Sequence, residues 1–225
     1  MPAANNSNVF FHEGLVFRSN LSQGQAVSKL CLLLHGWDGD ENSMQIFFSD
    51  FPEDVGIIAP RAPHKTKSKG YTWAYSFTDW AVIQNTPQFQ AGELRESAAD
   101  LVNAVQKWNG FFNLDVKTFF VAGFSQGGAM SLLLRLFYPD IFSRAACLSG
   151  FLPDGIEAEL PGELKPSTEI LMTHGTLDEI VPIAKAHETY QRLTALGLDV
   201  DYCEDRIGHK IGVDCRKKLR EYFMH

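Results

Sequence analysis

The chain has 225 residues, of which 45% are hydrophobic and 21% are charged, and its formal net charge is −7. This composition is typical of a soluble globular protein, and the length suits a single domain over residues 1–225. The negative charge and the lack of a long Lys/Arg run argue against nucleic acid or anionic lipid as the main partner. No apolar run is long enough to span a membrane, and the polar residues 1–8 predict a loose tail without a signal peptide.

The four cysteines predict a reducing, cytoplasmic setting. Cys31 and Cys147 lie inside apolar, strand-like runs and are expected to be buried thiols. Cys203 and Cys215 are too few to indicate a disulfide framework, and no pair has the C-x-x-C spacing of a zinc site. We therefore expect neither a metal nor a cofactor.

Apolar runs of strand length alternate with amphipathic helical segments along the chain. Continuous apolar runs are typical of parallel strands that are covered on both faces, and spacings of three and four residues indicate helices. Strands are expected at 14–18, 28–34, 55–59, 118–122, 144–149, 168–173 and 199–204. Helices are expected at 42–51, 92–109, 126–137, 182–196 and 212–224. This alternation predicts an α/β fold with one doubly wound, mainly parallel sheet and helices on both faces.

The motif G-x-S-x-G occurs at 123–127, between a predicted strand and a predicted helix. In this context the motif forms a nucleophile elbow, in which a sharp turn lifts the serine above the edge of the sheet. Gly123 and Gly127 leave the neighbouring positions without side chains, so that the backbone can close up. The pattern predicts Ser125 as a nucleophile, in preference to an ordinary glycine-rich turn.

A serine nucleophile needs a general base, and the base needs an acid that orients it. Sites in open α/β sheets form outside the carboxyl ends of the strands. Asp178 follows the strand at 168–173 and His209 follows the last strand, so Ser125, Asp178 and His209 occur in the chain order of G-x-S-x-G hydrolases. We expect His209 to be the base and Asp178 to hold it in one tautomer.

Other residues of the same types are weaker candidates. His187 lies in the middle of a predicted helix, and His225 is the last residue. Asp154 follows a strand and is the runner-up for the orienting acid. His174 is expected to pack near the Asp178 loop without a catalytic role.

Two backbone N–H groups are expected to stabilise the developing oxyanion. The residue after the nucleophile, Gln126, supplies one of them. The loop after the strand at 28–34 should supply the other, and Trp37 is the residue chosen there.

With these residues placed, the chain resembles the phospholipase/carboxylesterase family of α/β-hydrolases, which includes acyl-protein thioesterases. The resemblance implies a compact esterase without a large cap domain, with Ser125, Asp178 and His209 as its triad. By position, it also implies that Trp73, Phe151 and Ile180 line an acyl pocket. The matching stretches are Leu34-His35-Gly36, residues 59–63, residues 123–128, His174-Gly175 with Asp178 and Val181-Pro182, and Gly208-His209.

The chain differs from the eukaryotic thioesterases of that family near the expected oxyanion site. Those proteins carry Leu-Gly where this chain has Trp37-Asp38, and their acidic segment is not matched at 87–95. These differences argue against activity on acylated proteins and leave ester hydrolysis untouched.

The connection at 150–167 is too short for a cap domain, so cover for the site must come from the aromatic segment 71–89. We therefore expect an open, shallow site that favours short to medium acyl chains. The sequence predicts a serine carboxylesterase acting on a small-molecule ester. The alternatives are a lysophospholipase, an acyl thioesterase, more distantly a peptidase of the same fold, or a binding module that has lost catalysis. A fluorophosphonate probe would separate enzyme from binding module, whereas the natural ester and the oligomeric state, a homodimer included, stay open.

Overall fold

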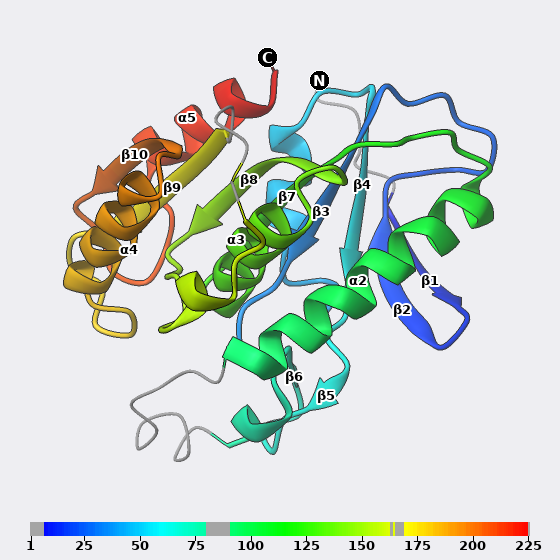
Figure 1. The fold of residues 1–225 in the computed structure, drawn as a ribbon. Helices are drawn as coiled ribbons and strands as arrows, with labels where there is room; N and C mark the ends of the chain where they lie inside the picture. The colour runs from blue at the N-terminus through cyan, green and yellow to red at the C-terminus, as the bar shows by residue number, and fades with distance from the viewer. Residues whose placement is uncertain (1–6, 80–90, 163, 165–168, 225) are drawn as a thin grey trace.

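An eight-stranded sheet forms the centre of the computed structural model, which describes residues 7–79, 91–162, 164 and 169–224 (Figure 1). The strands lie in the order β1-β2-β4-β3-β7-β8-β9-β10. Six neighbouring strands from β4 to β10 are parallel, whereas β1 and β2 pair antiparallel at one edge. The strands are β1 (Asn8–His12), β2 (Leu15–Ser19), β3 (Lys29–Leu34), β4 (Val55–Pro60), β7 (Phe119–Phe124), β8 (Phe142–Leu148), β9 (Glu169–Gly175) and β10 (Asp199–Asp205).

Helices cover both faces of this sheet. On one face lie α2 (Ala91–Phe112), α3 (Gln126–Phe137) and α4 (Ile183–Ala195), and on the other lie α5 (Val213–Met224) and the 3₁₀-helix η1 (Gln45–Asp50) (Figure 1). Alternate strand residues face opposite layers: Leu32 packs in the first core, and Leu33 packs in the second. The predicted α/β fold with a doubly wound, mainly parallel sheet is confirmed.

Long-range packing alters the predicted elements at the antiparallel edge. The strand β1 begins at Asn8, within the segment expected to be a loose tail. Its Phe10 stacks on Phe17 with ring centroids 5.5 Å apart, and it meets Phe112 edge-on at 5.3 Å. The helix α2 continues past Gly110, where it was expected to end, because burial of Phe112 outweighs the low helix propensity of glycine.

The two irregular connections carry only short elements in the part that the structure describes. Between β4 and α2 these are β5 (His64–Lys65), β6 (Tyr71–Thr72) and the 3₁₀-helix η2 (Tyr75–Phe77). Trp80 and Phe89 of the expected aromatic cover lie outside the described residues. After β8 there is one 3₁₀-helix, η3 (Ile156–Glu159), and no large cap domain, as predicted. None of the described helices is long and apolar enough to cross a membrane.

The prediction for the four cysteines is only half right. Cys31 and Cys147 are buried free thiols, and burial raises the pKa of Cys147 to about 12. Cys203 and Cys215, however, form a disulfide with their Cα atoms 5.6 Å apart. The sequence did not indicate this bond because the two cysteines meet only when the turn after β10 brings α5 back beside the strand. The loop that this disulfide closes contains His209.

Candidate active site

The serine predicted as nucleophile occupies a strained turn between β7 and α3. Ser125 has φ 55° and ψ −116°, which non-glycine residues rarely adopt. The turn is closed by backbone contact, since a Cβ atom on Gly123 would lie 1.9 Å from the carbonyl oxygen of Gly127. A Cβ on Gly127 would lie 2.2 Å from the carbonyl oxygen of Leu34. The chain therefore needs glycine on both sides of Ser125 to place the serine at this edge of the sheet.

A buried carboxylate holds the ring of His209. Asp178 Oδ2 accepts a hydrogen bond of 2.7 Å from His209 Nδ1. The other oxygen, Oδ1, accepts the backbone N–H groups of Ile180 and Val181, each at 2.9 Å, and the carboxylate side chain is 0% exposed. In the neutral tautomer that donates from Nδ1 to this carboxylate, the lone pair of His209 is on Nε2.

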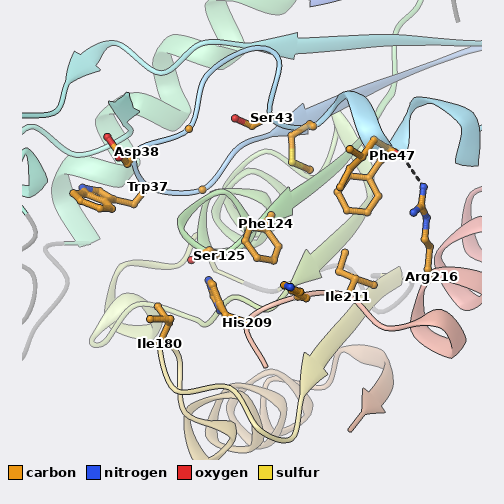
Figure 2. A pocket seen from close by; sticks show the side chains of 15 residues that line it. Trp37, Asp38, Ser43, Phe47, Phe124, Ser125, Ile180, His209, Ile211 and Arg216 are labelled. Carbon is orange, nitrogen blue, oxygen red and sulfur yellow. Dashed lines mark hydrogen bonds between the residues drawn. The ribbon is translucent and has the colours of Figure 1, made fainter. Parts of the chain in front are cut away.

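Ser125 and His209 line one cavity, in which His209 lies beside the serine (Figure 2). An imidazole with a free Nε2 is a general base for a hydroxyl group, and the carboxylate behind it stabilises the imidazolium that forms. The arrangement is suited to attack by a serine hydroxyl on an electrophilic carbon.

His174 is buried against the loop that carries Asp178. Its Nε2 donates to the carbonyl oxygen of Val181 at 2.8 Å and lies 3.4 Å from Asp178 Oδ2. Burial lowers the pKa of His174, so the ring is neutral, and its Nδ1 has no hydrogen-bond partner in the described part of the chain. Of the other histidines considered, His187 bonds Glu204 on the surface at 2.5 Å, and His225 lies outside the described residues.

Asp154, the runner-up for the orienting acid, forms ion pairs on the surface. Asp154 accepts a hydrogen bond of 2.7 Å from Lys185 and a longer one from Arg192. It does not line the cavity that contains Ser125.

The loop after β3, which carries Trp37, is held by hydrogen bonds on both sides. Inside it, His35 Nδ1 donates to the carbonyl oxygen of Gly36 at 2.7 Å, and Nε2 accepts the N–H of Ala62 at 3.0 Å. Burial lowers the pKa of His35 to about 4, so the ring is neutral and keeps this tautomer. The indole N–H of Trp37 donates to the carbonyl oxygen of Phe77 at 2.5 Å.

Gln126 connects the start of α3 to the segment around β6. Its side-chain oxygen accepts the N–H of Trp73 at 3.0 Å and the hydroxyl of Thr72 at 3.1 Å. Trp73 in turn donates its indole N–H to the carbonyl oxygen of His35 at 2.8 Å. Because the backbone N–H of Gln126 lies in the first turn of α3, it has no partner within the helix.

The cavity beside Ser125 has a volume of about 570 Å³. Of the three residues proposed for an acyl pocket, Ile180 lines it. The structure places Trp73 and Phe151 in the core of the first face, where they are 1% and 4% exposed. The lining residues are Gly36, Trp37, Asp38, Gly39, Ser43, Met44, Ile46, Phe47, Phe124, Ser125, Ile180, His209, Lys210, Ile211 and Arg216.

Sequence reasoning missed the part of this cavity formed by η1 and by the residues after His209. Phe47, Ile211 and Arg216 lie on the side of Ser125 away from Trp37 (Figure 2). The one signal that pointed to Ile211 and Arg216 is that they follow His209 closely in the chain.

Comparison with known proteins gives a consistent result. A sequence model of the phospholipase/carboxylesterase family matches residues 20–223. A probable inactive carboxylesterase from Oryza sativa subsp. japonica is 27% identical over 202 residues, which cover 82% of this chain and 79% of that protein. Esterase YpfH from Escherichia coli (strain K12) is 26% identical over 196 residues, with 84% and 79% covered.

Solved structures share the fold at low sequence identity. A carboxylesterase from Mesorhizobium loti superposes with a TM-score of 0.79 at 20% identity, covering 97% of this chain and 99% of that one. Acyl-protein thioesterase 2 from Zea mays gives a TM-score of 0.72 at 20% identity, covering 92% and 97%.

Proposed function

The chain belongs to the phospholipase/carboxylesterase family, and from that premise we propose that it is a serine carboxylesterase. It hydrolyses short- to medium-chain carboxylic esters of small molecules through an acyl-enzyme on Ser125. The observation that carries the proposal is the 2.7 Å hydrogen bond from His209 to Asp178, on a ring that shares its cavity with a strained serine.

In the proposed reaction, His209 Nε2 takes the proton of Ser125 as Oγ attacks the ester carbonyl carbon. The backbone N–H groups of Trp37 and Gln126 donate hydrogen bonds that stabilise the negative charge on the carbonyl oxygen. The imidazolium then protonates the leaving alcohol, and the acyl group stays on Ser125. His209 then deprotonates a water molecule that attacks the acyl-enzyme, and the imidazolium returns this proton to Ser125 Oγ as the acid leaves.

Two features support short to medium acyl chains. The cavity of about 570 Å³ is of the size that holds a small molecule, and the described residues include no cap domain over it. A series of p-nitrophenyl esters with increasing acyl length tests the proposal, with Ser125→Ala as the inactive reference. We expect kcat/KM to peak at short or medium length and to vanish in Ser125→Ala. A marked preference for long chains would overturn the proposed chain length.

Lysophospholipids and thioesters remain alternative substrates, because fold and triad residues are shared within the family and substrate choice depends on the loops. A thioester and a lysophospholipid of the same acyl length, run beside the p-nitrophenyl ester, decide between them.

A second candidate is a binding module without catalysis, which is favoured by one observation. The Oryza sativa relative bears the name of a probable inactive carboxylesterase. This chain, however, has a residue of the required type at each triad position, Ser125, Asp178 and His209. Binding of an ester without turnover would support the module.

The cytoplasmic location stays a prediction from the sequence. The disulfide between Cys203 and Cys215 counts against it, because disulfides persist mainly in oxidising compartments.

A further inference from the structure

A guanidinium group closes the end of the cavity that points away from Trp37. Arg216 lies on the first turn of α5, on the far side of Phe124 from His209 (Figure 2). Lys210 lines the cavity as well. The apolar side chains of Phe124, Phe47 and Ile211 line the cavity between the serine and the guanidinium, and this part of the cavity is called the Arg216 arm (Figure 2). A molecule bound by this arm would therefore leave water along an apolar segment and reach a cation at its end.

Arg216 is held in position by three contacts within the protein. Its Nε donates to Asp50 Oδ2 at 2.7 Å, and its Nη2 donates to the carbonyl oxygen of Ile46 at 2.5 Å (Figure 2, dashed line). The guanidinium also lies 5.5 Å from the centre of the Phe47 ring. A guanidinium that is fixed in this way loses little side-chain freedom when a ligand binds.

Two guanidinium groups, those of Arg216 and Arg220, share the carboxylate of Asp50. Asp50 is buried, and its second oxygen accepts a hydrogen bond of 2.8 Å from Arg220, so one carboxylate serves two guanidinium groups. Among the described residues, Nη1 of Arg216 has no hydrogen-bond partner and Lys210 has no ion pair. Of the described residues that line the cavity, Arg216 and Lys210 are cationic, and Asp38 is the one carboxylate.

The other end of the cavity, beside Trp37, carries a negative charge. Asp38 lines the cavity beside Trp37, away from Arg216 (Figure 2). Burial alone would raise the pKa of Asp38, but hydrogen bonds from Thr66 and neighbouring residues lower it overall, so the carboxylate is ionised. A substrate with an anionic end thus fits the cavity in one direction only.

We propose that the preferred substrates are esters that carry an anionic group, separated from the reacting carbonyl by an apolar segment, and that Arg216 is the residue that selects them. This inference rests on the proposed esterase function and names its substrate class. Carboxylate and phosphate groups both suit the two-pronged geometry of a guanidinium.

Two matched pairs of esters test the proposal on both sides of the ester bond. On the acyl side, p-nitrophenyl hexanoate is compared with the mono-p-nitrophenyl ester of adipic acid. On the alcohol side, hexyl acetate is compared with 6-acetoxyhexanoate. In each pair the chains have the same number of carbons, and only the end changes from methyl to carboxylate.

The measured quantity is the ratio of kcat/KM for the anionic ester to that for the neutral ester. We expect a ratio above one in at least one pair, a fall of about tenfold in Arg216→Gln, and a smaller fall in Arg216→Lys, which keeps the charge. The matched control is Lys217→Gln, which removes one charge from the same helix outside the cavity and should leave the ratio unchanged. Added salt should lower the wild-type ratio without any substitution.

Equal rates within both pairs would overturn the inference while leaving the esterase function intact. An equal loss in Arg216→Gln and Lys217→Gln would also overturn it, because the effect would then come from overall charge. If none of the four esters is hydrolysed and Ser125 reacts with no serine probe, the proposed function itself fails, and this inference fails with it.

Discussion

Two buried histidines shape the loops of the site without a role in the proposed chemistry. His35 bridges Gly36 and Ala62, and His174 lies between Val181 and Asp178. Burial lowers the pKa of both rings, so each is a neutral hydrogen-bonding element. Protonation of either ring would put a charge in the core beside the loops that hold Trp37 and Asp178.

The low pKa of His35 predicts that the protein loses stability in acid. The folded-state pKa is about 4, below the ordinary value of 6.5, so between these values the unfolded chain binds more protons than the folded one. Stability therefore falls as pH drops from 6.5 towards 4, by up to about 3 kcal/mol from this group. Urea unfolding at pH 7 and pH 4.5 should show a smaller loss in His35→Gln than in wild type. The half-buried His64 is the control position, and an unchanged pH dependence in His35→Gln would contradict the assignment.

The orienting role of Asp178 predicts that replacing its carboxylate by an amide lowers kcat strongly. Asp178→Asn keeps the size of the side chain but removes the charge and allows the wrong tautomer of His209. We expect kcat to fall roughly 10³–10⁴-fold with the fold retained. Asp154→Asn makes the same chemical change at a surface ion pair and should keep most of the activity. Similar losses in the two variants would count against the assigned acid.

Backbone contact at the elbow joins three elements, because Gly127 of α3 packs against the end of β3 directly after β7. We expect Gly127→Ala to destabilise the protein by about 1–3 kcal/mol, or to prevent folding, since its Cβ would meet the Leu34 carbonyl oxygen. Gly110→Ala is the matched control, because Gly110 lies in α2 with nothing within 4 Å of an added Cβ. It should stabilise the helix by up to about 1 kcal/mol. Thermal denaturation measures both, and a neutral Gly127→Ala would refute the tight elbow.

The connection from β10 to α5 carries His209 inside a disulfide-closed loop. Replacing Cys203 and Cys215 together by serine should lower the free energy of unfolding by about 3 kcal/mol, because the unfolded chain gains freedom. The same variant should have a lower kcat at temperatures where it is fully folded, since the loop that positions His209 is less constrained. Chemical denaturation and ester turnover measure the two effects. Unchanged stability would show that the turn itself, and not the bond, holds the loop.

For the molecule as a whole, the sequence predicted the features that depend on local residue patterns. Continuous apolar runs such as that in β3 marked the parallel strands, and the order of Ser125, Asp178 and His209 marked one edge of the sheet. The structure confirms the doubly wound sheet and brings Asp178 and His209 into contact.

What the sequence did not predict depends on contacts between distant segments. The strand β1 and the end of α2 stabilise each other through Phe10 and Phe112, and neither pattern shows this alone. The disulfide depends on the turn after β10. The arm that ends at Arg216 depends on Asp50, which is 166 residues away in the chain.

Labelling with a fluorophosphonate probe tests whether Ser125 is a nucleophile activated by His209. We predict one label per molecule, found by mass spectrometry on the peptide that contains Ser125. Labelling should be absent in Ser125→Ala and much slower in His209→Ala, and it should block ester hydrolysis in proportion to the fraction labelled. If the folded wild-type protein takes up no label, or if Ser125→Ala is labelled equally, Ser125 is not the activated nucleophile.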